Sequence, residues 1–480
     1  MALRLRAPRH KTSPIKRSNK ATATINEFKH MKKLLIIFLA VIGLAAAAPA
    51  QSLTLTTLVS FANTNGEYPE AGLTLGNDGN FYGTTDAGGG HSEGTVFRIT
   101  TNGLLTTLVS FANTNGSYPE AGLTLGNDGN FYGTTDAGGS NSDGTVFRVT
   151  TNGVLTTLVS FDKTNGEAPL AALTLGNDGN FYGTASAGGS NDVGTVFRMT
   201  TNGMLTSLVS FGSTNGENPH VALTLGNDGN FYGTTDAGGS HNDGTVFRVT
   251  TNGVLTTLVS FANTNGEYSV AGLTLGNDGN FYGMTTAGGL YSDGTVFRVT
   301  TNGVLTTLVS FTGDNGETPE AGLTLGNDGN FYGTTEGGGS HSFGTAFSMT
   351  TNGVLTTLVS FSGLNGEEPH AGLTLGNDGN FYGTTYEGGS AILGTVFCLA
   401  FPSPPVPFIT GVSLSGTNLV INATGQNAGT YVMLASTNLL LALGQWTSLT
   451  TNVLSGSGNF TTTNAMNPNV SALYFNLEAY

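Results

Sequence analysis

The sequence is dominated by a repeat with a fixed period of 50 residues. The octapeptide GNDGNFYG occurs seven times, starting at residues 76, 126, 176, 226, 276, 326 and 376. A second stretch, LTLTTLVSF in its first copy at 53–61, also occurs seven times in closely related forms. Its first copy precedes the first octapeptide, and no copy follows the last one. A fixed internal period indicates a repeat architecture, in which each unit buries its apolar surface against its neighbours.

Each repeat contains four segments typical of β-strands. In the first repeat, the expected strands cover residues 71–75, 80–85, 94–100 and 104–111. The turns Asn77-Asp78-Gly79 and Thr101-Asn102-Gly103 have the composition of tight hairpins in which the glycine adopts a positive φ. We expect no helix in the array, because each glycine inside a helix costs about 1 kcal/mol relative to alanine, and the chain contains 73 glycines.

The apolar residues of the expected sheets point to both faces. Phe81 and Tyr82 are adjacent in one strand and therefore lie on opposite faces, and so do Val96 and Phe97. Both faces of each sheet must then be covered, and radially stacked propeller blades cover both. A linear solenoid would leave its end sheets exposed, and neither end repeat has a polar cap.

The early copy of the LTLTTLVSF stretch favours a closed ring. If 53–61 pairs with 394–400, the seventh set of three strands acquires its fourth strand from the N-terminal side. We therefore expect an all-β fold: a seven-bladed β-propeller of four-stranded blades at 51–400, closed by the N-terminal strand.

The repeat resembles a known family. The pattern L-T-L-x-x-D-G-N-F-Y-G-T-T-x-x-G-G-x-x-x-x-G-T-V-F-R is similar to the tandem repeat called GloVer, found in exported bacterial proteins, and it covers residues 51–400. The resemblance implies a propeller-like secreted repeat protein. It implies no established activity and no catalytic residues.

The N-terminal region has the features of an export signal. Met31-Lys32-Lys33 is followed by LLIIFLAVIGLAAAAPA, which combines a basic start, a short apolar core and small residues before a cleavage site. The strongly apolar part, 34–44, is too short to span a bilayer comfortably. We expect a signal peptide at 31–50 after a leader or an unused upstream start at 1–30. The mature protein would then be secreted, periplasmic or at the cell surface, without a membrane span.

The C-terminal region lacks the repeat. Residues 401–408, FPSPPVPF, are typical of a stiff proline-rich linker. Residues 409–480 contain short strand-like segments at the spacing of a small β-sandwich and resemble immunoglobulin-like or fibronectin-type domains. We expect the single tryptophan, Trp446, in the core of this domain.

Charge excludes one class of partner. The chain has 16 Lys+Arg and 31 Asp+Glu, and ten of the basic residues but only one acid lie in residues 1–50, so the remainder carries a formal charge of −24. Nucleic acid binding requires clusters of basic residues, which this region lacks.

The single cysteine, Cys398, excludes an intrachain disulfide. We expect a monomer.

Most acids of the array fall in the loops expected at one end of the ring. These loops connect one blade to the next or join the second and third strands of a blade, and they vary between repeats, whereas the turns at the other end barely change. The expected binding face contains Glu67, Glu70, Asp86, Glu93, Asp136, Asp143, Asp236, Asp243, Glu317, Glu320, Glu367 and Glu368.

Three functions are compatible with this face. Loop acids can simply keep an exported protein soluble. They can also form a multivalent surface that binds a glycan, a cation or a basic protein. Calcium prefers clustered carboxylates, but no D-x-D-x-D-G loop is present. We therefore expect no cofactor and keep calcium as the alternative. The third function is a secreted propeller enzyme acting on a carbohydrate or a lactone.

Catalysis usually requires one asymmetric group of residues, and near-identical repeats oppose that arrangement. Two repeat positions carry histidine: His91, His241 and His341 share one, and His220 and His370 share the other. Because other residues replace them in the remaining blades, we interpret the histidines as variation in exposed loops, and a metal-binding or catalytic role is the alternative. We therefore expect a non-enzymatic binding or scaffolding module.

Overall fold

The computed structural model describes residues 53–401 and six strands between 408 and 479. Residues 53–401 form one compact unit, and the C-terminal strands belong to another. The expected leader, the signal peptide at 31–50 and Trp446 lie outside the described residues. No helix of the described residues is long and apolar enough to cross a membrane.

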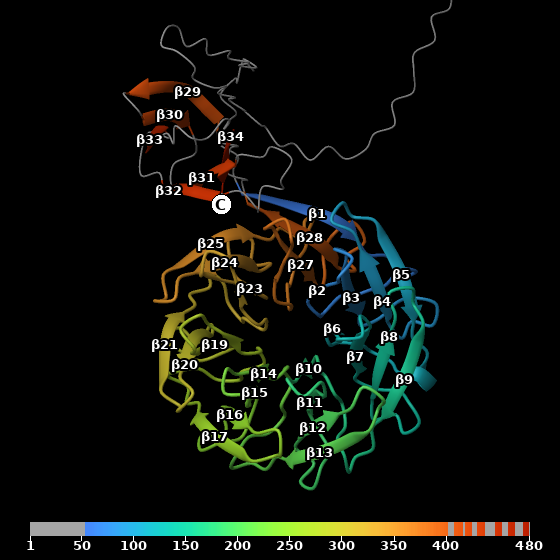
Figure 1. Cartoon of the computed structure of the whole chain (residues 1–480). Helices are drawn as coiled ribbons and strands as arrows, with labels where there is room; N and C mark the ends of the chain where they lie inside the picture. The colour runs from blue at the N-terminus through green and yellow to red at the C-terminus, as the bar shows by residue number, and fades with distance from the viewer. Residues whose placement is uncertain are drawn as a thin grey trace, which may run out of the picture. The chain divides into compact units, whose positions relative to one another are not determined.

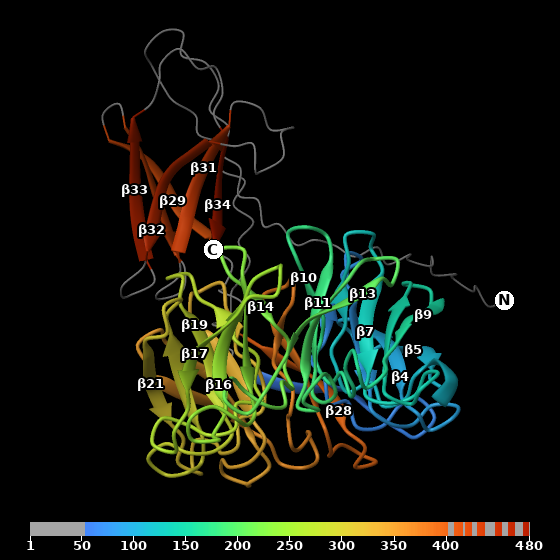
Figure 2. The same ribbon diagram turned by 90° about the horizontal axis from the view of Figure 1, so that it is seen from below.

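Residues 53–401 form seven four-stranded antiparallel sheets arranged as blades around a central axis (Figure 1). Figure 2 shows this unit from the side, with loops at both ends of the blades. The strands of blades 1 to 3 are β2 (Thr74–Leu75), β3 (Phe81–Thr85), β4 (Thr95–Ile99), β5 (Leu105–Ser110); β6 (Thr124–Leu125), β7 (Phe131–Thr135), β8 (Thr145–Val149), β9 (Leu155–Ser160); β10 (Thr174–Leu175), β11 (Phe181–Ala185), β12 (Thr195–Met199) and β13 (Leu205–Ser210).

The remaining blades repeat the same order from the axis outward. The strands of blades 4 to 7 are β14 (Thr224–Leu225), β15 (Phe231–Thr235), β16 (Thr245–Val249), β17 (Leu255–Ser260); β18 (Thr274–Leu275), β19 (Phe281–Thr285), β20 (Thr295–Val299), β21 (Leu305–Ser310); β22 (Thr324–Leu325), β23 (Phe331–Thr335), β24 (Thr345–Met349), β25 (Leu355–Ser360); β26 (Thr374–Leu375), β27 (Phe381–Thr385), β28 (Thr395–Ala400) and β1 (Thr54–Ser60).

The N-terminal strand completes blade 7, as expected. β1 pairs with β28 in antiparallel register, with Thr54 opposite Ala400 and Val59 opposite Val396. The pairing contains the same bulge as the outer strand pairs of the other six blades. Phe61 is buried among residues of blades 7 and 1, which joins the two ends of the repeat array.

The innermost strands are shorter than expected. The sequence predicted five residues at 71–75, but β2 contains only two. The residues before it lie where the blades converge: a Cβ placed on Gly72 would lie 3.2 Å from the carbonyl oxygen of Gly372 in the neighbouring blade. Instead of pairing within the blade, this segment accepts hydrogen bonds from a neighbour, for example from Thr374 Oγ1 to Leu73 O at 2.5 Å.

Seven equivalent aromatic contacts join neighbouring blades. Tyr82 of blade 1 stacks on Phe131 of blade 2 with a centroid distance of 4.1 Å, and Tyr382 of blade 7 packs on Phe81 of blade 1 at 4.2 Å. Both faces of the central strands are thus buried between blades, as the sequence predicted. One expectation was wrong in detail: a single 3-10 turn, η1 (Asn113–Asn115), lies in the connection between blades 1 and 2, because a local turn needs no repeating helical pattern.

The turns at the invariant end are stabilised by their aspartates. Asp78 accepts hydrogen bonds from the backbone and side-chain nitrogens of Asn80 and from the Tyr82 hydroxyl at 2.7–3.1 Å. Gly79 and Gly103 have φ values of 77° and 85°, which confirms the hairpins inferred from their composition.

The C-terminal strands form two three-stranded antiparallel sheets. One sheet contains β29 (Phe408–Ser415), β30 (Asn418–Thr424) and β33 (Asn459–Ala465), and the other contains β32 (Thr447–Val453), β31 (Thr430–Ser436) and β34 (Tyr474–Ala479). The immunoglobulin-like or fibronectin-type sandwich stays a prediction, because the segments that connect these strands lie outside the described residues.

Candidate functional site

At the variable end, backbone hydrogen bonds hold the loops of each blade together. In blade 1, the Asp86 N–H donates to Tyr68 O at 2.9 Å, and the Tyr68 N–H donates to Leu393 O of blade 7 at 3.0 Å. Tyr68 has a φ of 57°, and its six repeat equivalents are also left-handed, a conformation that costs a non-glycine residue about 1–2 kcal/mol. This strained turn brings Glu70 and Asp86 of one blade near each other.

Two repeat positions at this end differ strongly between blades. We call the fourteen residues at these positions the axial cluster, because the first position directly precedes the segment where the blades converge. The cluster consists of Glu70, Glu120, Leu170, His220, Val270, Glu320 and His370 at the first position, and Asp86, Asp136, Ser186, Asp236, Thr286, Glu336 and Tyr386 at the second.

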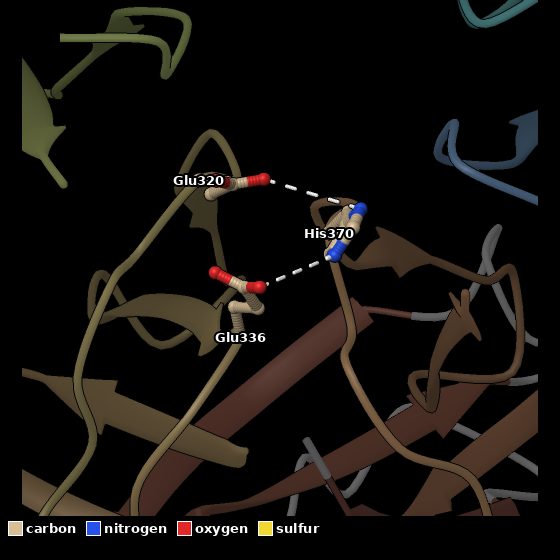
Figure 3. Close-up of side chains that lie close together, drawn as sticks. All are labelled: Glu320, Glu336 and His370. Carbon is tan, nitrogen blue, oxygen red and sulfur yellow. Dashed lines mark ion pairs between the residues drawn. The ribbon is translucent and has the colours of Figure 1, made fainter. Parts of the chain in front are cut away.

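His370 of blade 7 lies between carboxylates of both neighbouring blades. Its Nδ1 is 3.9 Å from a Glu320 oxygen of blade 6 and 4.0 Å from a Glu70 oxygen of blade 1, and its Nε2 is 3.8 Å from a Glu336 oxygen of blade 6. Figure 3 shows Glu320 and Glu336 facing the imidazole from the same side. The ring also stacks on Tyr386, with a distance of 4.7 Å between the ring centroids.

The His370 side chain is only 15% exposed. Burial lowers its pKa to about 4, so the imidazole is neutral at pH 7. The pKa of Glu320 moves in the opposite direction. Burial, followed by the negative charges of Glu336, Glu70 and Glu368, raises it to about 7.

A second group of carboxylates spans blades 1 and 2. Burial, followed by the charges of Asp86 and Asp136, raises the pKa of Glu70 to about 7. The pKa of Asp86 is raised to about 6 by burial and Asp136. Glu120 shows the largest shift of this group, to about 8, caused by burial and by the charges of Glu70, Asp136 and Asp86.

The opposite part of the axial cluster is mostly uncharged. Blades 3 and 5 contribute Leu170, Ser186, Val270 and Thr286. The Ser186 hydroxyl donates to Ala168 O at 2.9 Å, so it is already engaged. Between these blades, blade 4 carries His220, whose pKa is lowered by burial although Asp236 opposes this effect. The seven blades have the same fold, but the acidic residues of the axial cluster are distributed unevenly among them.

The comparison with protein families identifies the repeat. The model of the Gloeobacter/Verrucomicrobia repeat matches residues 47–226 and 177–397. The chain belongs to this repeat family. A comparison with curated proteins gives no match.

Among solved structures, this Gloeobacter/Verrucomicrobia repeat protein is similar in fold to the BP39L lectin from Burkholderia pseudomallei. The two share 10% identity over 70% of this chain and 98% of the lectin, with a TM-score of 0.51. A putative 6-phosphogluconolactonase from Bacteroides uniformis matches with 15% identity over 78% of this chain and 96% of that one, at a TM-score of 0.44. At these identities the likeness concerns the fold alone.

The structure divides the twelve acids of the expected binding face into two groups. Five lie in the axial cluster of the Gloeobacter/Verrucomicrobia repeat protein: Glu70, Asp86, Asp136, Asp236 and Glu320. The other seven lie in the same loops outside it: Glu67, Glu93, Asp143, Asp243, Glu317, Glu367 and Glu368. The charge interactions extend beyond the axial cluster. Burial and the charge of Glu387 raise the pKa of Glu367. The charges of Glu368 and Glu317, after burial, help to raise the pKa of Glu336.

Part of the histidine interpretation was wrong. His91, His241 and His341 are exposed, as expected for loop variation. His220 and His370 are instead largely buried, because the segment that carries them continues directly into the innermost strands. Sequence analysis also left Glu120 and Glu336 out of the expected site. A signal was available, since the residues at the first axial position vary although Ala71, Leu73 and their neighbours hardly do.

Proposed function

We propose that this protein is an exported, non-enzymatic binding module that holds one positively charged ligand at the axial cluster. The observation that carries the proposal is the group of Glu70, Asp86, Glu120 and Asp136, four interacting carboxyl groups from two neighbouring blades. Basic peptides and organic cations are the ligand class that this group would take.

The mutual repulsion of these carboxylates provides the driving force. An ammonium or guanidinium group placed among them would replace repulsion by attraction and by charge-assisted hydrogen bonds. Because a neighbouring positive charge favours the ionised form of an acid, Glu120 would lose its proton when the ligand binds. Binding at pH 7 would therefore release protons.

The irregularity of the axial cluster supports one ligand per ring. A multivalent surface, as the sequence suggested, would require the same groups in all seven blades. Only blades 1 and 2 combine a glutamate at the first axial position with an aspartate at the second. One equivalent is therefore the expected stoichiometry.

Calorimetry with a short oligolysine or oligoarginine peptide at low ionic strength tests the proposal on the full chain. We expect one site, proton release that is visible in buffers of different ionisation enthalpy, and affinity at least about tenfold weaker for Glu120→Gln. Glu93→Gln is the matched control, because Glu93 lies at the same end outside the axial cluster. Equal losses in both variants, or no binding by the parent, would contradict the proposal.

The basic start, short apolar core and small residues of 31–50 support export. N-terminal sequencing of protein recovered outside the cytoplasm is expected to begin at Gln51. A chain that retains Met31 would contradict the cleavage site.

A secreted enzyme acting on a carbohydrate or a lactone is the second candidate. The coupled carboxyl groups of Asp86 and Glu120 have pKa values of about 6 and 8, and such a pair can supply a base and an acid at neutral pH. Assays with chromogenic glycosides and lactones distinguish the two functions. Turnover abolished by Asp86→Asn and by Glu120→Gln would favour the enzyme, whereas peptide binding without turnover favours the module.

A further inference from the structure

We propose that Glu320, Glu336 and His370 form a binding site for a transition-metal dication such as Zn²⁺. The inference deepens the proposed function and rests on the axial cluster being a binding site. It concerns a different part of the cluster, however, at the junction of blades 6 and 7. Its test uses the metal alone and is therefore separable from peptide binding.

The first argument is the state of the imidazole. Both ring nitrogens of His370 are shielded from solvent and have no hydrogen-bond partner among the described residues. The nearest carboxylate oxygens, at 3.8–4.0 Å, are too distant for hydrogen bonds. Buried polar atoms without a partner are costly. A metal ion is one partner that a neutral imidazole nitrogen can bind.

The second argument is the spacing of the donor atoms. One ligand atom from each of Glu320, Glu336 and His370 can be chosen so that all three lie within 4.8 Å of one another. Tetrahedral zinc with ligand distances near 2.1 Å requires donor atoms about 3.4 Å apart. The side chains would need to move inward by only about 1 Å, and two of the three are long glutamates. Figure 3 shows both glutamates and the imidazole directed toward a common region.

The donor set indicates the class of metal. Calcium and magnesium prefer oxygen ligands alone, whereas zinc and its neighbours in the transition series bind imidazole together with carboxylates. The Glu70 carboxylate lies 4.0 Å from Nδ1 and adds negative charge next to the site. This donor set therefore favours a softer ion than the calcium considered from the sequence.

The repeat contains a natural control for this site. His220 occupies the same repeat position as His370 and is also largely buried. His220 belongs to blade 4. In blade 3, which precedes it, Leu170 and Ser186 occupy the repeat positions that Glu320 and Glu336 occupy in blade 6. The junction of blades 3 and 4 therefore offers a histidine in the same setting without the two glutamates, and it is not expected to hold the metal.

Calorimetry of the untagged, EDTA-treated full chain with ZnCl₂ tests the site. We expect one high-affinity equivalent and a loss of affinity on the order of 100-fold in His370→Leu and Glu336→Ser, which introduce the residues of blade 3. The control His220→Leu should bind like the parent. Thermal melting in EDTA identifies any variant that fails to fold. Such a variant is then replaced in the test by Glu320→Gln, which keeps the shape of the side chain.

A spectroscopic measurement identifies the ligand directly. The Cu²⁺-loaded chain should show electron paramagnetic hyperfine splitting from one nitrogen, and this splitting should disappear in His370→Leu but persist in His220→Leu. Unchanged Zn²⁺ affinity in His370→Leu, or no saturable binding by the parent, would overturn the metal site. Oligolysine binding that is lost in Glu120→Gln would still stand in that case, so the two proposals can fail independently.

Discussion

Blade 2 carries two acids that behave in opposite ways at its two ends. At the invariant end, hydrogen bonds from Asn130 and Tyr132 lower the pKa of Asp128, although its partial burial acts in the opposite direction. At the variable end, burial and three neighbouring carboxylates raise the pKa of Glu120 to about 8. Asp128 therefore stabilises the folded chain in its charged form. Acids in the axial cluster oppose folding when they are charged, and this repulsion is available for ligand binding.

Removal of residues 51–62 has the largest expected effect on stability, because the loops at the invariant end and at the variable end are both held in place by the closed ring. The five apolar residues of this stretch stabilise the ring by roughly 7 kcal/mol, which is comparable to the total stability of a typical protein. We expect loss of the cooperative melting transition, or oligomerisation through the exposed edge of β28. Adding a TTNG turn and a second copy of 53–61 after β28 should restore cooperative melting. A deletion variant that melts like the parent would contradict closure.

Replacement of Asp128 by alanine tests the invariant end. The variant loses three hydrogen bonds to a charged acceptor, and we expect a destabilisation of about 1–3 kcal/mol in denaturant unfolding. The folded-state pKa of Asp128 lies below its unfolded value, so its contribution is present above pH 3.8 and is lost as the pH falls through the folded-state pKa. The difference between variant and parent should therefore shrink in acid. Equal differences at pH 3 and pH 7 would argue against the turn network.

Glu120→Gln tests the variable end. It should change stability in the opposite direction to Asp128→Ala. The pKa of Glu120 is raised from 4.5 to about 8, so the folded state retains a proton that the unfolded state has lost. Its favourable contribution is complete below pH 4.5 and is lost as the pH rises toward 8 and beyond. We expect the variant to be more stable than the parent by about 1–2 kcal/mol at pH 9 and nearly equal to it at pH 4. A destabilised variant at pH 9 would remove the contrast between the two ends.

Thr135→Ala should have the smallest effect on stability. It tests whether a buried strand residue, which lies between the two ends of the blade, must be the same in every repeat. The Thr135 hydroxyl contacts Thr145 Oγ1 at 2.8 Å and donates to Ala137 O at 2.9 Å. Blade 3 already has Ala185 at the equivalent position, and this residue is fully buried. We expect a loss of at most about 1 kcal/mol in denaturant unfolding. A loss comparable to that of Asp128→Ala would show that blade 3 compensates for Ala185 elsewhere.

The sequence alone determined the propeller. The period of 50 residues and the Asn-Asp-Gly turns predicted seven blades, because both signals recur in every repeat. The single early copy of the outer strand predicted that the ring closes. The same regularity concealed the site. His370 has the surroundings of a loop residue in the sequence, and its partners Glu336 and Glu70 lie 34 and 300 positions away.

Only the tertiary structure decided which acids interact. The ring brings blade 7 next to blade 1, and convergence at the axis buries side chains that a linear reading places in exposed loops. Burial then sets the direction of the pKa shifts of His370, Glu320 and Glu120, since desolvation is the largest cause in each case. Composition fixes how many charges the chain carries, but the closed ring determines which of them must share a confined space.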